Sequence, residues 1–386
     1  MRILHTSDWH TGLTLKGQAR LEEQIAVLAE MVEIARDEQP DLIIVSGDLF
    51  DTATPSAAAQ KTFTRALSAL RDTGANVVVI AGNHDSGPAL EALRGWAESA
   101  GIALRGALGK SADHLISGTT DDGETWKVAA LPFISQRYAV RAAELFELTA
   151  AETEQSYASH LRRLIAQLAQ NFRPDDVNLI TAHLTVVGGT MGAGEREVHT
   201  VGDYVVPAHI FPPETSYVAL GHLHKAQKIA GPCPIRYAGA PIAVDFGEEH
   251  HQPSVTLVDV TASTPAQIRT IPLTKALPLL TVQGTLEELA EGEVPSDAWL
   301  RVIVAEPPRA GLRSEITELF PRALQIQIDP KVQASSSTAA PARRAGRHPQ
   351  ELFTAYLEEK GHRDEAVTAL FSELYDQTQT VAAEEK

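Results

Sequence analysis

Residues 2–10 read RILHTSDWH and residues 41–48 read DLIIVSGD, and in each an apolar run leads into a polar cluster that holds an aspartate. Short apolar runs of this kind are typical of buried strands. Between them, residues 20–38 carry apolar side chains at helical spacing. The beginning of the chain therefore predicts a strand, a helix and a second strand, with Asp8 and Asp48 close to the strand ends.

The alternation of predicted strands and helices continues to about residue 275. Strand–helix–strand order is typical of a sheet covered by helices, so the predicted fold class is α/β or α+β. Further helices are expected at 56–72 and 155–171, and further strands at 76–80, 127–131, 177–182, 217–220, 234–238 and 254–260.

The pattern changes after residue 275, which we take as the end of a first domain, 1–275. Residues 276–332 predict a small α/β domain, with strands at 279–283, 299–304 and 323–328 and helices at 285–290 and 313–320. Residues 333–348 are rich in small and polar residues and predict a flexible linker. Residues 349–380 predict a pair of helices.

Composition excludes several classes of protein. The chain has 386 residues, one cysteine and no apolar run of membrane-spanning length, so we expect a cytoplasmic protein without a membrane segment. Its formal net charge of −17 argues against a protein that holds DNA unaided, because phosphate neutralisation supplies most non-specific affinity. Bound cations or a partner protein would have to supply positive charge.

Several polar clusters directly follow predicted strands. Carboxyl ends of strands in such sheets lie along one edge, so clusters distant in sequence can meet there. Carboxylate, amide and imidazole ligands together suit Mn, Fe or Zn. Two such ions can clamp a phosphoryl group and activate water. The clusters are Asp8-Trp-His10, Gly47-Asp48, Gly82-Asn-His-Asp85, His183 and Gly221-His-Leu-His224.

Each cluster alone has an ordinary explanation, as a turn, a helix cap or a packed histidine. Their occurrence together, in this order, predicts a two-metal site. The same ordered blocks resemble the calcineurin-like metallophosphoesterases. The resemblance implies a four-layer arrangement, a two-layered β-sandwich flanked by helices, in place of a simple doubly wound sheet. It also implies Asp8, His10 and His224 at one metal, Asn83, His183 and His222 at the other, and Asp48 as the bridge.

Longer matches resemble the nuclease subunits of bacterial SbcCD complexes: Thr6–Gly12, Ser46–Asp51, Gly221–Gln227, Tyr237–Pro241 and Asp245–Glu248. The similarity covers about residues 1–275. It implies a DNA nuclease of DNA repair, replication and recombination, with double-strand exonuclease and single-strand or hairpin endonuclease activity and two divalent cations, Mn²⁺ foremost. It further implies a homodimer within a heterotetramer that contains an SbcC-type coiled-coil ATPase.

For the remaining segments the resemblance is architectural. It implies that 276–332 is a capping domain and that 349–380 binds the ATPase. Leu352, Phe353, Tyr356 and Leu357 form an apolar stripe that could equally pack on its own domain, and the preceding linker favours the partner. Apolar stripes at 57–72 and 88–99 are candidates for self-association, unless the domain itself covers them.

His84 and Asp85 are the expected catalytic residues. His84 adjoins the ligand Asn83, where it could stabilise or protonate the leaving oxygen, and Asp85 would hold its imidazole. The alternatives for His84 are a third metal ligand or a structural role. Asp51 is expected to shape its turn or support a ligand. Lys225 and Arg137 could contact phosphate or could simply be solvated.

Two other functions compete with the DNA nuclease. The same metals could hydrolyse small phosphodiesters such as cyclic nucleotides, or phosphoproteins. The capping and helical segments speak against this, since a small-molecule esterase has no evident need of them. An inactive scaffold would require missing ligands, and the full set is present.

Overall fold

The computed structural model describes residues 1–135, 157–192, 204–292, 294–336, 353–354, 356–357, 366–372 and 374–375. The chain forms two compact units. The first comprises Met1–Val282, Glu293–Val302 and Phe320–Gln325, and the second comprises Gln283–Gly292, Ile303–Leu319 and Ile326–Lys386. The expected domain boundary at 275/276 stays a prediction.

In the described part of the first unit, one six-stranded sheet has the order β16-β15-β1-β4-β5-β6. The last four strands of this order run parallel, β15 is antiparallel to β1, and β16 is antiparallel to β15. The loops that follow β1, β4 and β5 therefore leave the same edge of the sheet. The strands are β16 (Gln267–Pro272), β15 (Ser254–Asp259), β1 (Arg2–Thr6), β4 (Leu42–Ser46), β5 (Asn76–Ile80) and β6 (Ile102–Arg105).

A second six-stranded sheet among the described residues has the order β13-β14-β12-β9-β8-β7. Its four central strands are parallel, and both outer strands are antiparallel to their neighbours. The strands are β13 (Gln227–Ile229), β14 (Ile235–Tyr237), β12 (Tyr217–Gly221), β9 (Val177–His183), β8 (Thr125–Leu131) and β7 (Leu115–Thr119). Two short pairs join β2 (Thr14–Leu15) to β3 (Gln18–Ala19) and β10 (Thr185–Val186) to β11 (Val205–Val206).

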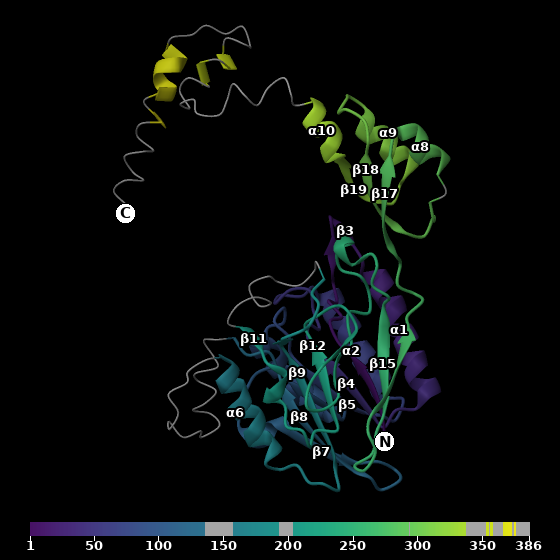
Figure 1. Cartoon of the computed structure of the whole chain (residues 1–386), viewed down its shortest axis with the longest axis vertical. Coiled ribbons are helices and arrows are strands. Elements are labelled where there is room, and N and C mark those ends of the chain that lie inside the picture. Colours follow the sequence, from purple (N-terminus) through teal and green to yellow (C-terminus); the bar gives the residue numbers. More distant parts are fainter. Residues whose placement is uncertain are drawn as a thin grey trace. The chain divides into compact units, whose positions relative to one another are not determined.

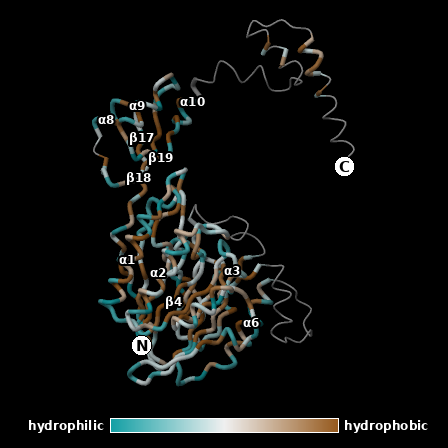
Figure 2. The backbone as a smooth tube through the Cα atoms, turned by 180° about the vertical axis from the view of Figure 1, so that it is seen from behind, coloured by the Kyte–Doolittle hydropathy of each residue, from teal (hydrophilic) through white to brown (hydrophobic). Residues whose placement is uncertain are grey.

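Side chains alternate between the two faces of each strand, so one strand contributes to different apolar cores on its two faces. In β4, Ile43 and Val45 belong to the core that includes α1 and α2, whereas Leu42 and Ile44 belong to the core between the sheets. In β9, Ile180 belongs to the core that includes α6. Figure 1 shows α6 and α1 on opposite flanks of the strands, and Figure 2 shows hydrophobic residues concentrated around β4. The four-layer sandwich implied by the resemblance is confirmed.

The helices begin and end for local reasons. Ser56 accepts a hydrogen bond from the Ala59 N–H at 3.2 Å and caps α2. Gln39 adopts a left-handed conformation and ends α1, with its N–H donating to Ala35. The described helices of the first unit are α1 (Leu21–Glu38), α2 (Ala57–Arg71), α3 (Gly87–Ala92), α4 (Arg94–Ser99) and α6 (Tyr157–Ala169), with 3₁₀ turns at Ser111–His114, Ala208–Ile210 and Phe246–Glu248.

A three-stranded sheet, β17-β18-β19, follows in the chain. Each expected element of this region is confirmed to within a residue or two. Thr285 and Glu288 form a reciprocal capping box at the start of α8. The elements are β17 (Leu279–Gly284), α8 (Leu286–Glu291), β18 (Trp299–Val304), α9 (Leu312–Leu319), β19 (Ala323–Ile328) and α10 (Pro330–Ser336).

The structure adds detail to two segments. The apolar stripe noted over 88–99 lies on two short helices, α3 and α4, which are separated at Leu93. The first residues of the linker expected over 333–348 overlap the end of α10, which runs from Pro330 to Ser336, and the bounds of that linker stay a prediction. The rest of that linker lies outside the described residues, and the described parts of 349–380 are helical.

The apolar stripe of α2 gives no support to self-association. Phe63 is fully buried and packs against Trp9 and Phe50, so the domain itself covers this face of the helix. Trp96 of α4 packs partly against the same core. Among the described helices, none combines the length and apolar character needed to cross a bilayer.

A buried polar cluster joins the two sheets near the carboxyl end of β4. Ser46 Oγ lies 3.0 Å from His5 Nε2 and 2.9 Å from Thr181 Oγ1. His5 Nδ1 lies 2.9 Å from the Tyr217 hydroxyl. At the same point Gly221 faces the Ser46 carbonyl so closely that a Cβ on Gly221 would overlap it. The sheets therefore approach each other here through backbone atoms.

We expect Gly221→Ala to lower the free energy of unfolding by about 1–3 kcal/mol, since the methyl group has to push the Ser46 backbone aside. Chemical denaturation would measure this. Gly95→Ala is the matched control, because a Cβ there has open space and lies in a helix. Equal stability of Gly221→Ala and the parent protein would contradict the close approach.

His5 should make stability depend on pH. Burial, with a contribution from Arg236, lowers the pKa of His5 to about 3. In the unfolded chain this histidine has a pKa near 6.5 and binds a proton at a pH where the folded protein keeps it neutral. The free energy of unfolding therefore falls as pH falls below about 6.5. Between pH 7 and 5 this loss amounts to about 2 kcal/mol. Chemical denaturation in the presence of a chelator would measure this. Between pH 7 and 5, His5→Gln should lose about 2 kcal/mol less unfolding free energy than the parent protein. An identical loss in both proteins would contradict the role of His5.

Candidate metal centre

The expected ligands come from loops at the carboxyl ends of strands in both sheets. β1 and β4 are parallel, and the loops after them carry Asp8 and Asp48. In the other sheet, His183 is the last residue of β9 and pairs with Gly221 of β12, which places His183 beside His222. Because the two sheets are joined at Ser46, these loops meet at one place.

The backbone of this region is held in an unusual conformation. Asp8, His10, Asp48 and His222 all have positive φ angles, which residues other than glycine rarely adopt. The Asp8 N–H donates to the Gly47 carbonyl at 2.9 Å, and the His10 N–H donates to the Asp48 carbonyl at 3.0 Å. Strain of this kind clusters at functional sites, where the surrounding structure stabilises it.

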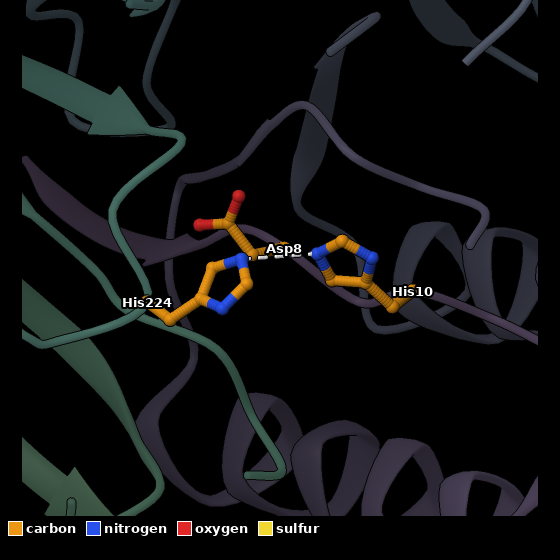
Figure 3. Close-up of side chains that lie close together, drawn as sticks. All are labelled: Asp8, His10 and His224. Carbon is orange, nitrogen blue, oxygen red and sulfur yellow. Dashed lines mark hydrogen bonds between the residues drawn. The ribbon is translucent and has the colours of Figure 1, made fainter. Parts of the chain in front are cut away.

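The first group of side chains consists of Asp8, His10 and His224. The two imidazole rings face each other with their Nε2 atoms 3.2 Å apart, beside the Asp8 carboxylate (Figure 3). Asp8 Oδ1 accepts the His222 N–H at 3.0 Å, and Oδ2 accepts the Ser7 hydroxyl at 2.5 Å. All three side chains are buried, and one atom of each lies within 4.8 Å of the others.

The second group consists of Asp48, His183 and His222, with Asn83 against it. Asn83 Oδ1 lies 2.9 Å from His183 Nε2 and 2.8 Å from His222 Nδ1. Asp48 Oδ2 lies 3.4 Å from His183 Nε2 and 3.8 Å from His10 Nε2. A single carboxylate oxygen of Asp48 therefore lies between one imidazole of each group.

The donor set fits a pair of cations. His183 Nδ1–H donates to the Ser46 carbonyl at 2.8 Å, which directs Nε2 toward the oxygens of Asn83 and Asp48. Those oxygens only accept, so without a cation the ring satisfies them by carrying a second proton. Burial alone would lower the pKa of His183, but Asp48 outweighs it and raises the pKa to about 9. A divalent ion would supply the same positive charge to all these atoms.

The two aspartates respond to the same environment in opposite directions. Burial would raise the pKa of Asp48, but the surrounding histidines, His183 foremost, hold it well below its usual range. Burial does raise the pKa of Asp8, although His183 and His224 oppose the effect. The carboxylate between the two groups is thus the one held most firmly in its charged form.

His84 lies beside the first group, and its ring contacts the edge of His10 at 4.7 Å between centroids. Its Nδ1–H donates to the Asp51 carbonyl at 2.9 Å, and its backbone N–H donates to Asp48 Oδ1 at 2.8 Å. His84, His10 and Asp48 also have ligand atoms within 4.8 Å of one another. The ring therefore faces the place where the two groups meet.

The expected role of Asp85 is corrected. Its oxygens accept backbone N–H groups of Gly82 at 2.7 Å, Leu49 at 3.1 Å and Phe50 at 3.0 Å. The Asp51 carbonyl, and not this carboxylate, accepts the hydrogen bond from His84 Nδ1–H. Asp85 thus fixes the loop after β5 to the loop after β4. Burial and the nearby Asp48 raise the pKa of Asp85 to about 6.

The two candidates for phosphate contact gain no support, and one buried acidic residue at the site was not predicted. Lys225 is exposed, and Arg137 lies outside the described residues. Glu248 is buried and lies 2.7 Å from His224 Nδ1, although the sequence indicated no role for it beyond the motif Asp245–Glu248. Its position beside His224 depends on chain folding between residues 225 and 247, which a local sequence pattern does not reveal.

Comparison with known proteins gives consistent results. Residues 1–226 match the model of the calcineurin-like phosphoesterase family, and residues 276–361 match a family described as the type 5 capsule protein repressor C-terminal domain. The SbcD component of nuclease SbcCD from Bacillus subtilis strain 168 is 38% identical over 284 residues, which cover 72% of this chain and 71% of that protein.

Two further relatives are SbcD components of the same nuclease. The protein from Rhodobacter capsulatus is 38% identical over 303 residues, which cover 74% of this chain and 73% of that protein. The protein from Escherichia coli K12 is 31% identical over 317 residues, which cover 80% of this chain and 76% of that protein. With this level of identity along most of both chains, and with the ligand blocks meeting at one site, the chain belongs to the calcineurin-like phosphoesterases and, within them, to the SbcD family of SbcCD nuclease components.

Proposed function

We propose that this protein is a metal-dependent nuclease that hydrolyses phosphodiester bonds in DNA, as both exonuclease and endonuclease, together with an SbcC-type ATPase. The observation that carries the proposal is the position of Asp48 Oδ2 between His10 and His183, which gives two ligand groups one shared carboxylate. Family membership supports the nuclease activity, since the relatives are named as components of a nuclease.

Two divalent cations are the proposed cofactors, Mn²⁺ foremost. Asp8, His10 and His224 would hold one, Asn83, His183 and His222 the other, and Asp48 both. When bound, such ions polarise the scissile phosphate and lower the pKa of a water molecule toward 7. Mixed oxygen and imidazole ligands favour Mn²⁺ over Mg²⁺, which prefers oxygen alone.

His84 is the proposed catalytic acid. Its Nδ1–H donates to the Asp51 carbonyl, and Nε2, the other ring nitrogen, would carry a proton toward the leaving oxygen of the substrate. Asp85 acts indirectly, because it holds the loop on which His84 lies.

The carboxyl-terminal part is the proposed attachment to the ATPase. Tyr356, Leu370 and Leu374 are 54%, 55% and 52% exposed, although all three are large and apolar. Apolar side chains exposed on helices favour a protein partner. On this basis 349–380 is the proposed partner-binding segment. The resemblance to the SbcD family supports 276–332 as a capping domain and 333–348 as the linker. A homodimer in a heterotetramer, a cytoplasmic location and roles in DNA repair, replication and recombination belong to the same proposal.

The deciding experiment is cleavage of linear and hairpin-ended duplex DNA by the full-length chain in Mn²⁺, with and without the ATPase partner. We expect Mn²⁺-dependent cleavage that is abolished by chelation and by Asp48→Asn. Cyclic-nucleotide hydrolysis in the absence of any DNA cleavage would overturn the proposal in favour of a small-molecule phosphodiesterase.

His84→Gln should lower the turnover number about 10²–10⁴-fold, because glutamine can hydrogen-bond but cannot deliver a proton. The Mn²⁺ content of the variant should remain that of the parent protein, as measured by elemental analysis after dialysis. Loss of metal together with activity would instead identify His84 as a ligand. Unchanged turnover would reject the role of an acid.

A further inference from the structure

His224 and His183 are held from behind by different chemical groups. His224 Nδ1 donates to the Glu248 carboxylate at 2.7 Å, whereas His183 Nδ1 donates to the Ser46 backbone carbonyl at 2.8 Å. The two proposed cation sites thus differ in the acceptor of one imidazole. In the Asp8–His10–His224 site, His224 donates to an anionic carboxylate. In the Asn83–His183–His222 site, His183 donates to a neutral backbone carbonyl.

The position of Glu248 is determined by its own loop. The side chain is 1% exposed, and its second oxygen accepts the Val244 N–H at 2.9 Å. Asp245 Oδ1 accepts the Gly247 N–H at 2.9 Å and caps the 3₁₀ turn Phe246–Glu248. A buried carboxylate is costly unless it is hydrogen-bonded, and both oxygens of this one have a partner.

The contact has two consequences for His224. Donation from Nδ1 fixes the tautomer, so the Nε2 lone pair faces His10 Nε2 at 3.2 Å and the Asp8 carboxylate (Figure 3). The negative charge behind the ring also makes Nε2 a stronger electron-pair donor. Carboxylates in this position typically change metal affinity about 10–100-fold.

We propose that Glu248 is a positioning residue that sets the cation affinity of the Asp8–His10–His224 site and leaves the Asn83–His183–His222 site unaffected. This inference rests on the proposed metal centre. It assigns the two sites different determinants of affinity, one an acidic side chain and the other the backbone that joins the sheets.

The test is a titration of the chelator-treated full-length chain with Mn²⁺. Electron paramagnetic resonance measures the concentration of free Mn²⁺ at each point. The parent protein should bind two ions. In Glu248→Gln one binding step should weaken about 10–100-fold while the other stays unchanged. Glu249→Gln is the matched control, because this neighbouring carboxylate contacts Thr281 and Arg301 and no proposed ligand. It should bind both ions as the parent does.

A second variant shows which ion is affected. Asn83→Ala removes a ligand of the Asn83–His183–His222 site, so its remaining tight binding step belongs to the Asp8–His10–His224 site. Adding Glu248→Gln to this variant should weaken that remaining step by the full factor of about 10–100. Nuclease activity of Glu248→Gln should return at raised Mn²⁺ with a near-normal maximum rate, since the residue acts on binding and not on the reacting atoms.

Three results would overturn the inference. Unchanged binding in Glu248→Gln would do so and would leave the proposed nuclease function intact. Equal weakening of both steps, with a lower midpoint of thermal unfolding for the metal-free variant, would show a purely structural role. Absence of Mn²⁺ binding in the parent protein would refute the proposed function as well.

Discussion

The close contact between Gly221 and the Ser46 carbonyl determines where the two sheets can share a site. A Cβ on Gly221 would overlap that carbonyl, and the same oxygen accepts the Nδ1 proton of His183. Backbone atoms of β4 and β12 therefore meet directly, the His183 side chain of β9 joins them, and the loops that follow these strands are brought together. The ligands of the first sheet, Asp8 and Asp48, reach those of the second only because this approach is so short. A wider separation of the sheets would leave two half-sites, each with too few ligands for a cation.

Electrostatics makes the same region dependent on positive charge. Asp8, Asp48 and Glu248 are buried carboxylates, and each lies against an imidazole or a backbone N–H. A proton on His183 can take the place of a cation, because Asp48 raises the pKa of this imidazole to about 9 against the effect of burial. Cations and protons therefore compete for the same lone pairs, which links metal binding to pH. The net charge of −17 is compatible with an acidic substrate on this basis, because the proposed cations would present positive charge where a phosphate group would bind.

Strands of the central sheets could be predicted from sequence because they are buried on both faces and read as continuous apolar runs, as in Leu42–Val45 and Val77–Ile80. Edge strands such as β7 and β16 were missed, since their partly exposed residues mix polar and apolar types. Assignment of each strand to a sheet did not follow from local pattern either. The second sheet followed from the resemblance of the ligand blocks and was then confirmed by the pairing of β9 with β8 and β12.

Roles that depend on contacts between loops were harder to predict than the ligands themselves. The metal ligands could be predicted because they are residue types that bind cations and because they follow predicted strands. Asp85, by contrast, lies next to His84 in sequence, yet its carboxylate turns to backbone N–H groups of Leu49 and Phe50. The acceptor for His84 Nδ1–H is the backbone carbonyl of Asp51, in the loop after β4, and not the Asp85 carboxylate that was expected to hold this ring. Adjacent position in the chain is thus a poor guide to which group orients an imidazole, because the geometry is decided by the neighbouring loop. The same reasoning applies to Glu248, which meets His224 across an intervening pair of strands, β13 and β14.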